Sequence, residues 1–91
     1  GADTDGLVDM PRNIVGVEAV VLFSEVEPGR VKVSMRSTGR LVVDRLAAAL
    51  GGGGHAHAAG VSLRATRAEA RARILPELHR LVVALASEPR P

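Results

Sequence analysis

Polar and apolar residues alternate most clearly between Arg30 and Ser37. Odd positions as far as Met35 are apolar, whereas the even positions carry Lys32, Ser34 and Arg36. An alternation with a period of two is typical of a strand with one buried face. We therefore predict a strand whose odd-numbered side chains enter the core, while the even-numbered ones face water or a ligand.

Two further strands are predicted on either side of this one in the sequence. The run from Val17 to Val26 is rich in apolar and β-branched residues on both faces, which favours a central strand. Pro28 and Gly29 are a strong turn signal, so this run and the next should form a hairpin. Small and apolar residues from His57 to Leu63 predict the third strand.

A long helix is predicted after the third strand. Thr66 and Glu69 have the spacing of a capping box, and the helix should extend to about Ala86. Pro76 lies inside it, which predicts a kink or two abutting helices. The apolar stripe expected to be buried comprises Ile74, Leu78, Leu81, Val82 and Leu85.

These elements predict an α+β domain with a small mixed β-sheet and helices packed on it. We expect residues 1–6 to be a disordered start or an expression remnant, with a helical turn from Leu7 to Met10. Residues 7–87 should form a single domain, and residues 88–91 a frayed tail.

Composition narrows the classes of function. The chain has no cysteine, so disulfides and thiolate zinc sites are excluded, and it has no long apolar run or signal peptide pattern. We therefore expect a cytoplasmic protein. The net charge is only +2, and Phe23 is the only Phe, Tyr or Trp, which argues against an aromatic platform for stacking bases. Any nucleotide contact must depend on arginine, histidine and backbone.

The four glycines at positions 51–54 are the most unusual stretch of the chain. They follow a short predicted helix that starts with Asp44 as N-cap, and they precede a strand. Phosphate loops have the opposite order, so an anion here would need successive backbone N–H groups, assisted by Arg36 and His55 if their strands are neighbours. The alternative interpretation is a helix cap followed by close strand packing.

Three segments together resemble a known family. They are Val31–Ser37, Asp44–Leu50, and the pattern GGGGH followed by AAG between Gly51 and Gly60. They are similar to the C-terminal DHH-associated domain of DHH-family phosphoesterases, over roughly Leu7 to Leu85. Within that family the similarity is strongest to the bacterial type that hydrolyses oligoribonucleotides and 3′,5′-bisphosphate nucleotides.

The resemblance implies a two-domain enzyme of which this chain is the substrate-binding part. In that family an N-terminal domain with an Asp-His-His signature holds two metal ions, usually manganese, that activate water. This chain contains no such signature, so it should be inactive alone and hold no metal. Its expected partners are short RNA or a nucleotide phosphate and the DHH domain of the same parent protein, with no membrane.

The same resemblance implies which residues bind substrate. The glycines and His55 would contact the phosphate, and Arg36 with Ser37 would bind phosphate or the terminal nucleotide. No catalytic residue is expected in this chain. The full set of predicted substrate-binding residues is Arg36, Ser37, Gly52, Gly53, Gly54 and His55.

Several alternatives stay open at this point. The parent could be a cyclic-dinucleotide phosphodiesterase, or the chain could be a stand-alone nucleic-acid-binding module. His55 and His57 would lie on one strand face and could bind a metal, although two histidines without a third ligand seldom fix zinc. Arg64, Arg67 and Arg71 could attract RNA, but we interpret them as a solvated helix face.

Overall fold

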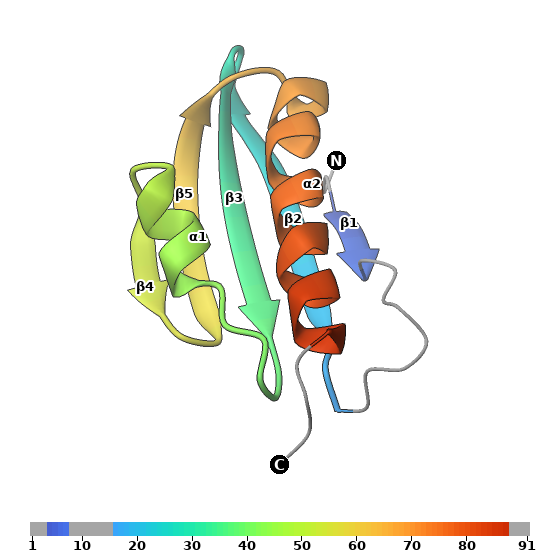
Figure 1. Ribbon diagram of the computed structural model, residues 1–91. Helices are drawn as coiled ribbons and strands as arrows, with labels where there is room; N and C mark the ends of the chain where they lie inside the picture. Colours follow the sequence, from blue (N-terminus) through green and yellow to red (C-terminus); the bar gives the residue numbers. More distant parts are fainter. Residues whose placement is uncertain (1–3, 8–15, 88–91) are drawn as a thin grey trace.

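The computed structural model describes residues 4–7 and 16–87. It contains a five-stranded sheet with the strand order β1-β2-β3-β5-β4 and two helices (Figure 1). The strands are β1 (Thr4–Leu7), β2 (Ala19–Glu27), β3 (Arg30–Ser37), β4 (Gly53–His55) and β5 (Ala58–Arg64). The helices are α1 (Asp44–Ala49) and α2 (Arg67–Ala86).

The predicted α+β class is confirmed, but the sheet is not mixed. All four strand pairings are antiparallel. The β2–β3 hairpin and the β4–β5 hairpin account for two of these pairings, and β5 then returns alongside β3. Short connections join antiparallel neighbours, whereas a parallel pair would need a long crossover.

Both helices lie on the same face of the sheet (Figure 1). The core forms between this face and α2, and Phe23, Val31, Val33 and Met35 are at most 1% exposed. The buried residues of α2 recur every four positions: Ala70, Ile74, Leu78 and Val82. Three members of the predicted apolar stripe are therefore confirmed, whereas Leu81 is 37% exposed and Leu85 only partly buried.

The start of α2 has the predicted capping box. The Thr66 hydroxyl accepts from the Glu69 N–H at 3.1 Å, and the Glu69 carboxylate accepts from the Thr66 N–H at 2.8 Å. These bonds, the backbone one first, lower the pKa of Glu69. The helix continues through Pro76, so the interpretation as two abutting helices was wrong. Neither helix within the described residues is long and apolar enough to cross a membrane.

The start of α1 differs from the prediction by one residue. The N-cap is Val43, without a side-chain capping bond, and Asp44 is the first helical residue. Val43 is fully buried and its N–H donates to Ala56 O at 2.8 Å. Tertiary contacts therefore set this boundary, not a polar cap.

The amino-terminal prediction needs a correction where the structure describes it. Thr4–Leu7 form β1, and the pairing Leu7↔Val20 adds it to the free edge of β2. These residues are therefore a strand instead of a disordered start, and Leu7 does not open a helical turn. The rest of that predicted turn and the predicted tail at 88–91 lie outside the described residues.

Candidate functional site

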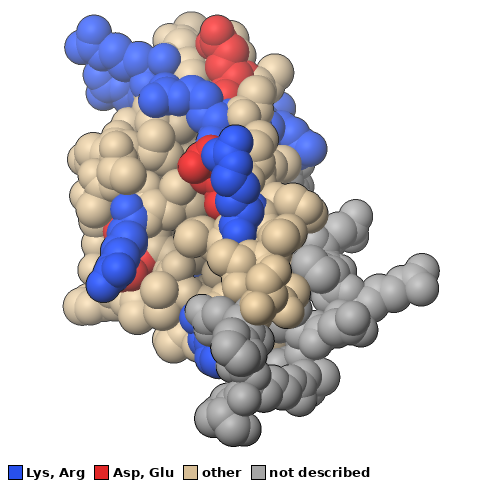
Figure 2. Space-filling view, in the orientation of Figure 1, with Lys and Arg blue, Asp and Glu red and all other residues tan. Residues whose placement is uncertain are grey.

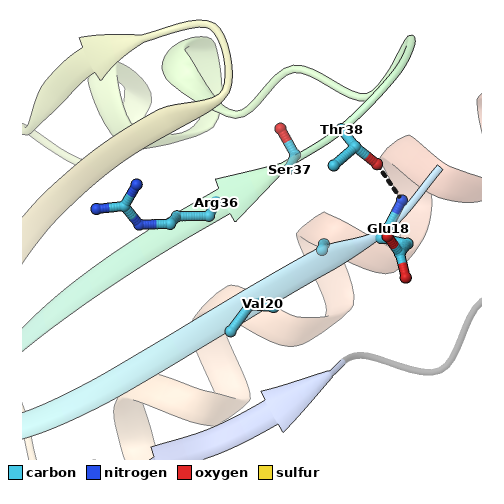
Figure 3. Close-up of a pocket in the computed structure, with 6 residues that line it drawn as sticks. Glu18, Val20, Arg36, Ser37 and Thr38 are labelled. Atoms are coloured by element: carbon cyan, nitrogen blue, oxygen red, sulfur yellow. Dashed lines mark hydrogen bonds between the residues drawn. The ribbon is translucent and has the colours of Figure 1, made fainter.

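The face of the sheet opposite α1 and α2, called the open face below, carries the polar side of β3. Val31, Val33 and Met35 are buried, whereas Lys32 and Arg36 are exposed. The predicted alternation is therefore confirmed. Arg36 extends sideways from β3, away from Glu18 and Thr38 (Figure 3).

Arg36 and His55 lie in one row across the open face. The register pairs Val20 with Arg36, Arg36 with Ala58, and Ala58 with His55. Paired residues in a sheet project to the same face. The strands that carry Arg36 and His55 are therefore not neighbours, since β5 separates them by two inter-strand spacings, about 10 Å. In this row only the methyl group of Ala58 stands between the Arg36 and His55 side chains.

A groove with a volume of about 280 Å³ runs over this part of the open face. Its base is formed by small residues, including Gly53, Ala58 and Gly60, while Lys32 and Arg36 are its cationic lining residues. The residues that line it are Lys32, Ser34, Met35, Arg36, Gly53, Ala58, Ala59 and Gly60. A small, flat base beside a guanidinium leaves room for a tetrahedral anion.

Arg36 also borders a second hollow of about 180 Å³ on its β2 side (Figure 3). Glu18, Val20 and Thr38 line this hollow together with Ala19 and Ser37. The Thr38 hydroxyl accepts from the Glu18 N–H at 2.9 Å, which closes the end of β2 onto β3. Arg36 thus separates two hollows on one face.

Ser37 does not join Arg36 in the groove through its hydroxyl. It is 8% exposed and its Oγ donates to Leu41 O at 2.7 Å. The alternation of β3 could have indicated this, because position 37 shares the parity of the buried residues. Lys32, by contrast, lines the groove and was not among the predicted binding residues.

The first two glycines of the run end α1. Gly51 has φ +97° and its N–H donates to Ala48 O at 3.1 Å, while the Gly52 N–H donates to Ala47 O at 2.8 Å. This is the bonding pattern of a Schellman motif. The N–H groups of Gly51 and Gly52 therefore satisfy helix carbonyls and do not face the groove.

The remaining glycines form β4, where the sequence predicted a loop. Gly54 has φ +146°, and a Cβ there would lie 2.6 Å from Ala58 O. A Cβ on Gly52 would likewise collide with Gly60 O, so both positions need glycine for close backbone packing. Gly53 differs: its φ is not positive and a Cβ would meet nothing within 4 Å. Backbone packing thus explains Gly52 and Gly54 but not Gly53.

His57 does not share a strand face with His55. It occupies the turn between β4 and β5, and its Nε2 lies 2.8 Å from Gly39 O. The predicted placement of both rings on one face was therefore wrong, because the chain reverses between them. Over residues 4–7 and 16–87, no group of three or more His, Asp or Glu side chains comes together as a metal site.

The three arginines near the start of α2 do not form one helix face. Arg64 ends β5, whereas Arg67 Nη2 donates to Glu25 Oε1 at 3.4 Å. Arg71 is exposed on α2. Arg64 therefore belongs to the sheet, where it pairs with Arg30 of β3.

Comparison with known proteins supports the resemblance drawn from the sequence. A family profile described as the DHHA1 domain matches residues 1–86. A curated protein from Thermus thermophilus, the bifunctional oligoribonuclease and PAP phosphatase NrnA, is 42% identical over 62 residues, or 68% of this chain. Those residues are 19% of that protein, so the chain spans about a fifth of its length. Because the profile covers every element from β1 to α2, this chain belongs to the DHHA1 domain family.

Proposed function

We propose that this chain is the substrate-binding domain of a metal-dependent DHH phosphoesterase. The parent enzyme would hydrolyse short oligoribonucleotides or adenosine 3′,5′-bisphosphate in the cytoplasm. The similarity to the Thermus oligoribonuclease and PAP phosphatase supports this substrate class over a cyclic dinucleotide. The chain would contribute binding and no catalytic residue.

The observation that carries the proposal is the row of Arg36, Ala58 and His55 beside Gly53. Arg36 can donate two parallel hydrogen bonds to a phosphate, and the His55 ring can donate one from the other side. The absent side chain at position 53 keeps open the part of the groove next to this row, where Gly53 pairs with Gly60. In this proposal Ser37, Gly52 and Gly54 hold the backbone around the groove in place and do not contact the phosphate.

The reacting groups would come from another part of the parent protein. The described residues do not fit a two-metal centre, because no three potential ligands converge. We therefore assign the metal ions, expected to be manganese, to a DHH domain of the parent chain. That domain would meet the open face, and the role of this chain would be to orient the phosphate toward it.

Titration of the chain with a dinucleotide and with adenosine 3′,5′-bisphosphate tests the proposal, with amide shifts as readout. We expect shifts centred on Arg36, Gly53 and His55. Arg36→Ala and His55→Ala should each weaken binding by about 1.5 to 3 kcal/mol, since each removes a charge-assisted hydrogen bond.

Arg80→Ala is the matched control for the loss of one positive charge. Arg80 is paired with Glu77 on α2, on the face away from the groove, so its removal should leave affinity almost unchanged. Unmoved amides at millimolar ligand, or equal losses in Arg36→Ala and Arg80→Ala, would refute the proposed site.

A further inference from the structure

Basic residues continue along the open face beyond the groove. Lys32 lies four positions from Arg36 on β3, and Arg30 lies two positions further. On the neighbouring strand, the register pairs Lys32 with Ser62 and Arg30 with Arg64. The end of the open face near the β2–β3 turn therefore gathers three cations around the Ser62 position.

The described residues neutralise this cluster of positive charges only in part. Like charges directly opposite each other on paired strands are destabilising, and Arg30 directly opposes Arg64. Glu27 Oε1 lies 3.4 Å from Arg30 Nε, so one of the two charges has a partner. Among residues 4–7 and 16–87, no acidic side chain forms an ion pair with Lys32 or Arg64.

On the helix-bearing side of the molecule, by contrast, several basic side chains lie against acidic ones. Blue side chains in the middle of Figure 2 have red ones against them. Arg80 is paired with Glu77 on α2, and Arg67 with Glu25. Two arginines on that side are thus paired with acidic side chains of the chain itself, whereas Lys32 and Arg64 have no ion-pair partner among the described residues.

We infer that Lys32 and Arg64, with the hydroxyl of Ser62, form a second phosphate subsite, and that the ligand is a single RNA strand running along β3. The inference rests on the proposed function, because the first phosphate of that strand occupies the Arg36 site. Four residues of strand separate the Arg36 and Lys32 positions by about 13 Å. That distance exceeds the span between the two phosphates of one nucleotide but suits phosphates further along an extended strand.

The floor between the two subsites fits such a strand. Ser34 and Gly60 are directly paired there, and both are partly buried. Neither carries a charge or a bulky side chain, so a sugar and its base can pass over them. No aromatic residue lies in this row of the open face, which favours recognition of the backbone over recognition of base identity.

The test compares a 5′-phosphorylated dinucleotide with a 5′-phosphorylated pentanucleotide of adenylate, both titrated into the 91-residue chain by calorimetry and amide shifts. We expect the pentanucleotide to bind more tightly and to shift the amides of Lys32, Ser62 and Arg64, which the dinucleotide leaves unmoved. Lys32→Gln and Arg64→Gln should each weaken the pentanucleotide about two- to fivefold, the range of an exposed charge pair.

The salt dependence gives an independent readout. Each lost phosphate contact should reduce the slope of log K against log salt by about 0.7 for a single strand. Arg80→Gln, which removes a paired charge on α2, should change neither the slope nor the affinity. The circular dichroism spectrum of each variant checks that it is folded.

Two results would overturn this inference while leaving the Arg36 site intact. One is that the dinucleotide and the pentanucleotide bind with equal affinity. The other is that Lys32→Gln and Arg64→Gln weaken the binding of the dinucleotide as much as that of the pentanucleotide. Failure of the proposed function looks different, because Arg36→Ala would then leave dinucleotide binding unchanged.

Discussion

The two faces of β3 share one backbone and the same neighbouring strands, yet they have opposite environments. Val31, Val33, Met35 and Ser37 are at most 8% exposed beneath the helices. On the other face Lys32 and Arg36 are exposed, and no described element covers them. The core face is fixed by what packs against it within the chain. The open face lacks such a partner, which leaves its charges available to a ligand.

Truncating a side chain on the core face of β3 should lower the free energy of unfolding far more than truncating one on the open face. Met35→Ala removes a side chain that is 1% exposed, so we expect a loss of about 2 to 5 kcal/mol in the free energy of unfolding. Its neighbour Ser34 projects to the open face, and Ser34→Ala should change stability by no more than about 0.5 kcal/mol. Urea denaturation of both variants measures the difference. Similar losses in both would show that the open face is also packed in solution.

Substitutions of Gly54 and Gly53 should separate an effect on stability from an effect on phosphate binding. Gly54→Ala forces a Cβ against Ala58 O and a positive φ, so it should destabilise the chain by about 1 to 3 kcal/mol. Gly53→Ala meets open space and should leave stability within about 0.5 kcal/mol of the original chain. Its phosphate affinity should nevertheless fall, because the methyl group enters the groove.

Thermal unfolding and a phosphate titration of both glycine variants separate the two effects. A stable Gly53→Ala variant with unchanged affinity would contradict the role given to the open space. A Gly54→Ala variant as stable as the original would contradict the close approach of β4 to β5.

Weakening the start of α2 should disturb the covered face least. Thr66→Ala removes the hydroxyl that accepts from the Glu69 N–H, and we expect a loss of about 1 kcal/mol. Because α2 contacts the open face nowhere in the described residues, ligand affinity at the groove should not change. A drop in affinity that parallels the drop in stability would show that the two faces are coupled.

The same cap makes stability depend on pH. Hydrogen bonds from the Thr66 backbone and side chain lower the pKa of Glu69 from its ordinary value of 4.5. The folded state therefore favours the ionised carboxylate, so this contribution is present above pH 4.5 and is lost as the pH falls through the lowered pKa. Glu69→Gln should flatten this part of the profile of melting temperature against pH. An unchanged profile would assign the acid sensitivity to other carboxylates.

Local patterns were sufficient for most of the sheet and both helices. The alternation in β3 and the capping box of α2 are signals that need no tertiary information, and both were confirmed. β4 could not be predicted in this way, since glycine has low strand propensity and contributes no side-chain pattern. It becomes a strand only because Gly53, Gly54 and His55 pair with β5.

The candidate site also divides into residues that a local pattern predicts and residues whose positions depend on strand pairing. The alternation along β3 correctly placed Arg36 outside the core, and it could also have indicated that the Ser37 side chain is buried. The position of His57 depends on a chain reversal directly after β4, for which the segment GGGGHAHAAG carries no Pro-Gly or Asn-Gly turn signal. Similarly, the like-charge pair of Arg30 and Arg64 exists only through the register of two strands far apart in sequence.

The four glycines have different structural roles, which matters when related sequences are compared. Gly51, Gly52 and Gly54 are needed for the turn at the end of α1 and for the close β4–β5 hairpin that follows. Only Gly53 is needed to keep the space above the groove open. A sequence that keeps the first three but carries a larger residue at position 53 should therefore retain the fold and lose the phosphate site. This single position would then distinguish binding-competent members from structural ones.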